Sequence, residues 1–75
     1  MYRIIYLEAE TGYKTFDSDN DQVIEYELQL SEQQKCVICV VDYVKQAIRN
    51  KCRDFSNHTD SIDHMIFDPK YVSQF

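Results

Sequence analysis

The sequence predicts an α+β fold, a small antiparallel sheet of three or four strands with one long helix packed on it. The first thirty residues contain segments typical of strands, a stripe of apolar residues at helical spacing follows, and the chain has only one glycine and one proline. The expected order is β-β-β-α and then a short strand or turn. A chain of 75 residues holds one core, so we expect a single small acidic domain over residues 1–75.

The N-terminal segment predicts a β-hairpin. Residues 2–9 are rich in Ile, Tyr and Leu, and residues 13–17 are expected to pair with them across the loop Glu10–Gly12. The glycine stands where a three-residue loop needs a left-handed residue, and this register sets Glu8 opposite Lys14. Both faces of the first strand are apolar, which favours a central place in the sheet and leaves open which face meets the helix.

A third strand is predicted over residues 24–30. These residues alternate strictly between apolar and polar side chains, Ile-Glu-Tyr-Glu-Leu-Gln-Leu, and a period of two is typical of a half-buried strand. Glu25 and Glu27 would then project together from the solvent face.

A helix is predicted from Glu32 to about Lys51. Ser31 and Gln34 have the spacing of a capping box at its start. An apolar stripe at helical spacing follows, made of Val37, Val41, Val44 and Ile48. β-Branched residues have modest helix propensity, so a strand in this segment stays an open alternative.

The C-terminal third is polar from Arg53 to Asp63. The short apolar run Met65–Phe67 is a candidate fourth strand, which a turn at Asp68–Pro69 would end. Three apolar residues beyond it are expected to cover an edge of the core, namely Tyr71, Val72 and Phe75.

The net charge of −5 lies in the first half of the chain. Residues 1–35 hold eight acids and three bases, whereas residues 36–75 hold five of each. An acidic surface repels nucleic acid and attracts basic protein surfaces, although an ordinary solvated sheet face is the plain alternative. The residues expected to bind a partner are Glu8, Glu10, Asp17, Asp19, Asp21, Glu25 and Glu27.

Four residues follow a spacing close to that of zinc fingers, C-x2-C-x12-C-x5-H, namely Cys36, Cys39, Cys52 and His58. A helix through residues 32–51 opposes this site, because at 1.5 Å per residue it separates Cys39 from Cys52 by about 20 Å. The sequence therefore predicts no metal ligands and no cofactor.

The segment Asp17–Asp21 opens like a calcium-binding loop, with aspartates at alternate positions. Gln22 and Leu28 stand where such a loop needs glycine and a bidentate glutamate. A solvated turn is the plainer interpretation, and whether the turn binds a cation stays open.

Catalysis is not expected. His58 and His64 lie near serines in the sequence, but a single glycine offers little means of building an oxyanion hole or a phosphate-binding loop. The pair Cys36 and Cys39 has the thioredoxin spacing but lacks the parallel β-α-β unit of that fold.

The location expected is the cytoplasm. No stretch approaches the ~20 apolar residues that cross a bilayer, and Glu8 interrupts the first apolar run before a signal peptide could form. An odd count of three cysteines fits free thiols in a reducing compartment. We expect no contact with a membrane.

These patterns favour a non-enzymatic inhibitor that uses an acidic sheet surface to occlude a basic site on a partner protein, including a nucleic-acid-binding groove. In this general character the chain resembles the small acidic inhibitors that phages use against host defences, including anti-CRISPR proteins. The resemblance is one of type, rests on no shared motif and assigns no residue.

Two alternatives come from other classes. A zinc-stabilised adaptor or nucleic-acid module would use the three cysteines and His58. A homo-oligomeric structural protein would use exposed tyrosines and the apolar tail Met65–Phe75.

Overall fold

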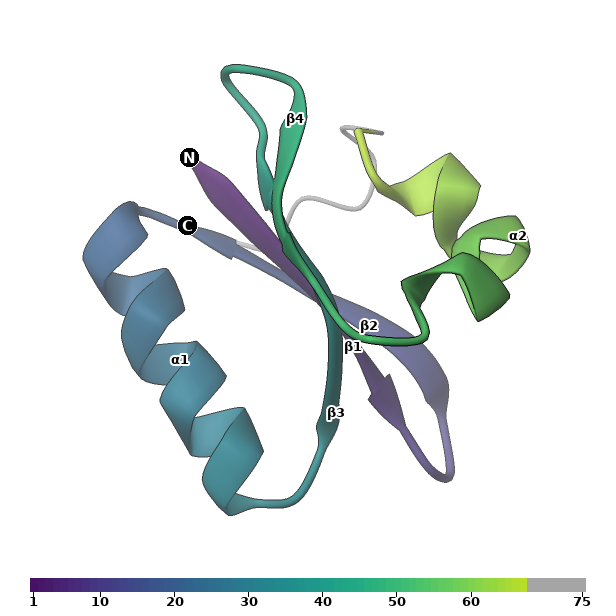
Figure 1. Cartoon of the computed structure of the whole chain (residues 1–75). Helices are drawn as coiled ribbons and strands as arrows, with labels where there is room; N and C mark the ends of the chain where they lie inside the picture. Colours follow the sequence, from purple (N-terminus) through teal and green to yellow (C-terminus); the bar gives the residue numbers. More distant parts are fainter. Residues whose placement is uncertain (68–75) are drawn as a thin grey trace.

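The computed structural model describes residues 1–67 and confirms the α+β class (Figure 1). Four antiparallel strands form one sheet in the order β2-β1-β3-β4. The predicted order β-β-β-α is wrong, because the long helix lies between the second and third strands. The elements are β1 (Tyr2–Glu8), β2 (Gly12–Ser18), α1 (Asn20–Glu32), β3 (Cys36–Asp42), β4 (Ala47–Lys51), the 3-10 turn η1 (Phe55–Asn57), α2 (Thr59–Ile62) and the 3-10 turn η2 (Asp63–Met65).

The predicted N-terminal hairpin is confirmed as β1 and β2, with a register two residues away from the predicted one. Glu8 pairs with Gly12, and Lys14 pairs with Tyr6. Gly12 has a φ of 87°, the left-handed conformation that the loop was expected to need. Because strand side chains alternate with a period of two, a shift of two residues leaves every side chain on its predicted face.

The predicted strand over residues 24–30 is wrong, and this segment belongs to α1. Asp19 caps the helix, since its carboxylate accepts a hydrogen bond of 3.0 Å from the backbone N–H of Gln22. Val23 and Leu30 are buried, and their separation of seven residues is two helical turns. The alternating pattern had placed Ile24 and Leu28 inward, whereas their exposed fractions are 43% and 61%.

The predicted helix over Glu32–Lys51 is also wrong. The segment forms β3 and β4, so the strand alternative is the one that the structure shows. Val37 and Val41 fall on opposite faces of the sheet, and Val44 is 78% exposed in the connecting turn. β-Branched side chains pack well on a pleated surface, and this preference outweighs the helical spacing.

The predicted central position of β1 is confirmed by the strand order, and both faces of the sheet are covered. Figure 1 shows α1 along one side of the sheet and the segment with α2 along the other. The α1 side holds a core of Ile4, Tyr6, Val23, Leu30 and Val40. The opposite side holds Ile5, Ile38, Cys39, Val41, Ile62, Met65 and Ile66. The even-numbered face of β1 is therefore the one that meets the long helix.

A bulge in β3 supplies part of the second core. Ile5 of β1 pairs with Cys39 and Tyr6 pairs with Val37, so Ile38 is an extra residue between them. Such an insertion changes the alternation of side chains. Ile38 and Cys39 consequently both face the core on the side of the sheet that α2 covers.

The fourth strand is β4, and the run Met65–Phe67 is not a strand. Met65 ends the turn η2, and its side chain is buried with Ile66 in the second core. The residues expected to cover a core edge, namely Tyr71, Val72 and Phe75, and the turn at Asp68–Pro69 lie outside the described residues. Within residues 1–67, no helix is long and apolar enough to span a membrane.

Candidate functional site

The outward side of α1 carries an acidic stripe. The helix contains the acids Asp21, Glu25, Glu27 and Glu32 and no lysine or arginine. Positions 21, 25, 28 and 32 follow helical spacing, and all four side chains are exposed together with Ile24. We call this surface the α1 outer face, and its members are Asp21, Ile24, Glu25, Leu28 and Glu32.

Part of the charge on this face opposes the stability of the helix, although Asp21 itself lies in the first turn, where the helix dipole favours an acid. Asp21 and Glu25 are like charges four residues apart, an arrangement that costs an isolated helix about 0.2–0.5 kcal/mol. Glu32 lies in the last turn, where the helix dipole favours a base, and no base is present there. Within residues 1–67, no salt bridge is formed by Asp21, Glu25 or Glu32. A local conflict of this kind, without a compensating contact, is typical of functional surfaces.

Three of the other predicted acids, Asp17, Asp19 and Glu8, serve the fold. Asp17 is 1% exposed and pairs with Arg3, so it is not available to a partner. Asp19 caps α1. Glu8 binds the ammonium of Lys35 at 3.1 Å, and this hydrogen bond, followed by one from Thr11, lowers the pKa of the Glu8 carboxyl.

Two predicted acids lie apart from the stripe. Glu10 is exposed in the β1–β2 loop. Glu27 is half-buried and lines a small pocket with Val37 and Lys51. Of the seven predicted partner-binding residues, the structure brings Asp21 and Glu25 together on one exposed face. The members that the sequence analysis missed are Ile24, Leu28 and Glu32, which a helical reading of residues 20–32 would have found.

The five tyrosines that the structure describes are buried or half-buried. Met65 and Ile66 at the start of the apolar tail belong to the core. Phe67 is 37% exposed, and the rest of the tail lies outside the described residues, so the homo-oligomeric alternative stays open.

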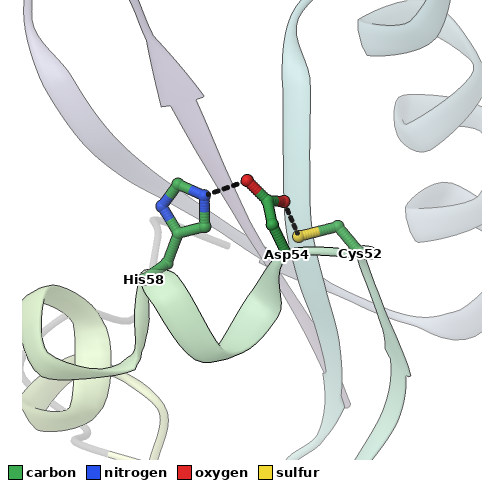
Figure 2. A group of neighbouring side chains, drawn as sticks. All are labelled: Cys52, Asp54 and His58. Atoms are coloured by element: carbon green, nitrogen blue, oxygen red, sulfur yellow. Dashed lines mark hydrogen bonds and ion pairs between the residues drawn. The ribbon is translucent and has the colours of Figure 1, made fainter.

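The four candidate zinc ligands do not converge as a set. Cys36 is exposed, whereas Cys39 is buried, and burial raises the pKa of the Cys39 thiol to about 12. The helix that opposed a metal site is absent, but the structure brings together only Cys52 and His58 of the four, with Asp54 as a third member (Figure 2). This trio is the one group of three or more acidic, cysteine or histidine ligands that converges within residues 1–67, so Asp17, Asp19 and Asp21 form no such group.

Asp54 joins the other two side chains of this cluster. The Cys52 thiol donates to Oδ1 of Asp54 at 3.2 Å, and Nε2 of His58 lies 3.2 Å from Oδ2 (Figure 2). The bond from Cys52, followed by the one to His58, lowers the pKa of the Asp54 carboxyl. Asp54 is 56% exposed and His58 is 15% exposed, so the cluster opens to solvent on the Asp54 side.

A tyrosine from the opposite end of the sheet orients the imidazole. The hydroxyl of Tyr13, in β2, lies 2.7 Å from Nδ1 of His58, and the two rings meet edge to face at 5.8 Å between centroids. Tyr13 lies 45 residues from His58 in the sequence, and no local spacing pattern indicates this contact.

The arrangement does not suit nucleophilic catalysis. Burial, followed by the hydrogen bond to Asp54, raises the pKa of the Cys52 thiol, whereas a nucleophilic cysteine needs a lowered pKa. The hydrogen bond of Nε2 runs to Asp54 and not to the sulfur. The cluster therefore lacks the direct contact between thiol and imidazole that activates a cysteine.

No protein-family model, curated protein or solved structure matches this chain.

Proposed function

We propose that this protein is a non-enzymatic inhibitor that binds a basic site on another protein through the α1 outer face. The observation that carries the proposal is the exposed stripe of three carboxylates beside Ile24 and Leu28, on a helix without a single base. Basic sites of this kind include nucleic-acid-binding grooves. The general type is that of the phage proteins that block host defences, anti-CRISPR proteins among them.

The two kinds of side chain on this face have different physical tasks. Unpaired carboxylates attract a basic partner over several ångströms and raise the rate of encounter, an effect that salt screens. From Asp21 to Glu32 the stripe extends about 16 Å at 1.5 Å per residue. Such a row imitates a short stretch of phosphate backbone, which offers one charge per 3.4 Å on each DNA strand, at a lower charge density.

Leu28 and Ile24 are suited to the centre of the contact. Burial of the exposed part of Leu28, which is 61% exposed, contributes about 1–2 kcal/mol at 25 cal/mol per Å². Apolar anchors surrounded by charges are typical of interface cores with a polar rim. The carboxylates thus attract the basic partner and fix its position along the helix. The two aliphatic side chains stabilise the bound complex.

The cytoplasm is the proposed location of this activity. All three cysteines are free thiols, which supports a reducing compartment.

The test starts with capture of partners from a cell lysate at low salt, followed by reconstitution of each binary complex from purified components. Affinity is then measured for Asp21→Asn with Glu25→Gln, and separately for Leu28→Ser. We expect the double neutralisation to weaken binding at least about tenfold and to flatten its salt dependence. Leu28→Ser is expected to weaken binding and leave the salt dependence unchanged.

The matched control is Asp60→Asn with Asp63→Asn, which removes the same charge from exposed positions of the C-terminal segment. The proposal requires that this control binds like the unmodified protein. A partner that loses equal affinity in both charge variants, or in neither, contradicts the assignment of the α1 outer face.

A further inference from the structure

We infer that Cys52, Asp54 and His58 form a binding site for a divalent transition metal ion, and that Zn²⁺ is the ion that fits best. Their ligand atoms all lie within 4.8 Å of one another (Figure 2). A thiolate, an imidazole and a carboxylate are the three side-chain groups that bind zinc in proteins. This site is independent of the α1 outer face, because the cluster adjoins the core on the opposite side of the sheet.

The distances fit a tetrahedral ion after a small adjustment. Zinc bonds of about 2.0 Å to oxygen or nitrogen and 2.3 Å to sulfur imply separations between ligand atoms of about 3.3–3.5 Å. Oδ1 of Asp54 lies 3.2 Å from the sulfur of Cys52, and Oδ2 lies 3.2 Å from Nε2 of His58. The sulfur and Nε2 lie within 4.8 Å of one another, so closure of the site needs both groups to turn toward one carboxylate oxygen of the exposed Asp54.

The backbone presents the three side chains from one short segment. Cys52 directly follows β4, and its N–H donates to the carbonyl of Ile38 at 2.9 Å. The turn η1 then closes, with the N–H of Phe55 donating to the carbonyl of Cys52 at 3.2 Å and that of His58 donating to Phe55 at 2.9 Å. Ligands held on a hydrogen-bonded turn against the sheet need little ordering when the ion binds.

Tyr13 has the position of an outer partner that orients a histidine ligand. With the imidazole proton on Nδ1, this nitrogen donates to the hydroxyl oxygen of Tyr13, 2.7 Å away, and the lone pair of Nε2 is left for the metal. Such a contact fixes both the tautomer and the direction of the ring. It is the second observation, beyond the convergence of the ligands, that indicates a metal.

The charge of the ligands and the softness of the sulfur atom determine which metal ion the site favours. One thiolate and one carboxylate neutralise a divalent cation, so the half-buried site carries no net charge when filled. A sulfur ligand disfavours Mg²⁺ and Ca²⁺ and favours zinc and similar metals. Binding breaks the S–H bond of Cys52 and releases one proton to solvent, and water occupies the fourth position on the side where Asp54 is exposed.

The test is a titration of the purified, reduced protein with Co²⁺, which reports sulfur ligation through a thiolate-to-metal charge-transfer band in the near ultraviolet. We expect one equivalent of Co²⁺ to produce the band, and Zn²⁺ to displace it. Cys52→Ser should abolish the band, and Asp54→Asn and His58→Gln should each weaken binding at least about tenfold. Tyr13→Phe should weaken it by about tenfold, as loss of an outer partner does.

The matched control is Cys36→Ser, which removes an exposed thiol that lies outside the cluster. The inference is overturned if Co²⁺ gives no band, if the band survives Cys52→Ser, or if Cys36→Ser removes it. Should the Cys52 variant fail to fold, alkylation of the unmodified protein decides the matter. Zn²⁺ must then protect Cys52 and leave Cys36 reactive, and equal reactivity of Cys52 with and without Zn²⁺ excludes the site.

Discussion

The guanidinium of Arg3 and the carboxylate of Asp17 form a two-bonded ion pair across β1 and β2, with both side chains fully removed from solvent. The two hydrogen bonds measure 2.8 and 2.9 Å. Nη1 of Arg3 also donates to the carbonyls of Met65 and Ile66. One buried cation thus connects the N-terminal hairpin to the segment that covers the second face of the sheet.

Asp17→Asn is expected to destabilise the protein by about 3–5 kcal/mol, because it leaves Arg3 as an uncompensated charge in the core. Urea unfolding followed by circular dichroism measures the change. Replacement of both partners, Arg3→Met with Asp17→Leu, should cost less than the single substitution, since no charge remains buried. A single substitution with the small effect of the surface variant Asp21→Asn would contradict the buried pair.

The cysteines should differ sharply in reactivity. Cys36 is exposed, whereas burial raises the pKa of Cys39 to about 12. A thiol-specific reagent at pH 8 is therefore expected to modify Cys36 rapidly and Cys39 only after unfolding, with the sites assigned by mass spectrometry. Rapid modification of Cys39 in the folded protein would show that the second core is not closed over it.

The same raised pKa makes stability fall in alkali. The unfolded thiol of Cys39 ionises near its ordinary value of 9.0, whereas the folded one keeps its proton to about pH 12. The unfolded state therefore binds fewer protons in this window, and the free energy of unfolding decreases by up to about 1.4 kcal/mol per pH unit. Cys39→Ala should remove this component, as measured by urea unfolding between pH 8 and pH 11. Equal slopes for both proteins would contradict it.

The ion pair of Glu8 and Lys35 should contribute to acid sensitivity. The hydrogen bond from Lys35 lowers the pKa of Glu8, so its stabilisation is present above the unfolded pKa and is lost as the pH falls through the lowered value. Glu8→Gln is expected to lose less stability than the unmodified protein between pH 6 and pH 2. Glu10→Gln, at an exposed position of the same hairpin, serves as the control and should follow the unmodified curve.

Gly12→Ala should destabilise the hairpin by about 1–2 kcal/mol through the backbone alone. Gly12 has a φ of 87°, and a Cβ built there meets no atom within 4 Å, so no steric clash contributes. Gly12→Asn should cost less than Gly12→Ala, because asparagine tolerates the left-handed conformation better. Denaturant midpoints of the two variants provide the comparison, and an equal loss would indicate a cause other than φ.

The sequence was sufficient to place the first hairpin, although not its register, because the signals of a hairpin are local. The loop glycine and the apolar faces of residues 2–9 lie within a few residues of one another. The two later segments were exchanged because each is locally ambiguous. Residues 24–30 alternate like a strand but follow the helix-capping Asp19, and the valines of residues 37–48 have helical spacing in a β-branched run.

The candidate sites were predictable only to the extent that they depend on neighbours in the sequence. The sequence showed that acids are concentrated before residue 35. It did not show which of their carboxylates are exposed and which stabilise the fold. Asp17 needs Arg3, 14 residues away, to be recognised as a core residue. Cys52, Asp54 and His58 are brought together by the turn η1, for which the polar segment after Lys51 gives no sequence signal.

The position of β1 between β2 and β3 also has a consequence for synthesis on the ribosome. Its partner β2 follows at once, but the other edge of β1 pairs Tyr2 with Asp42 and Leu7 with Cys36. The hairpin of β1 and β2 therefore keeps an unpaired strand edge until β3 has been synthesised. Unpaired edges of this kind can pair with other chains and cause aggregation. Helix α1 lies between β2 and β3 in the chain and packs on Ile4 and Tyr6 in the complete fold, so it is available to cover one face of the hairpin before β3 emerges.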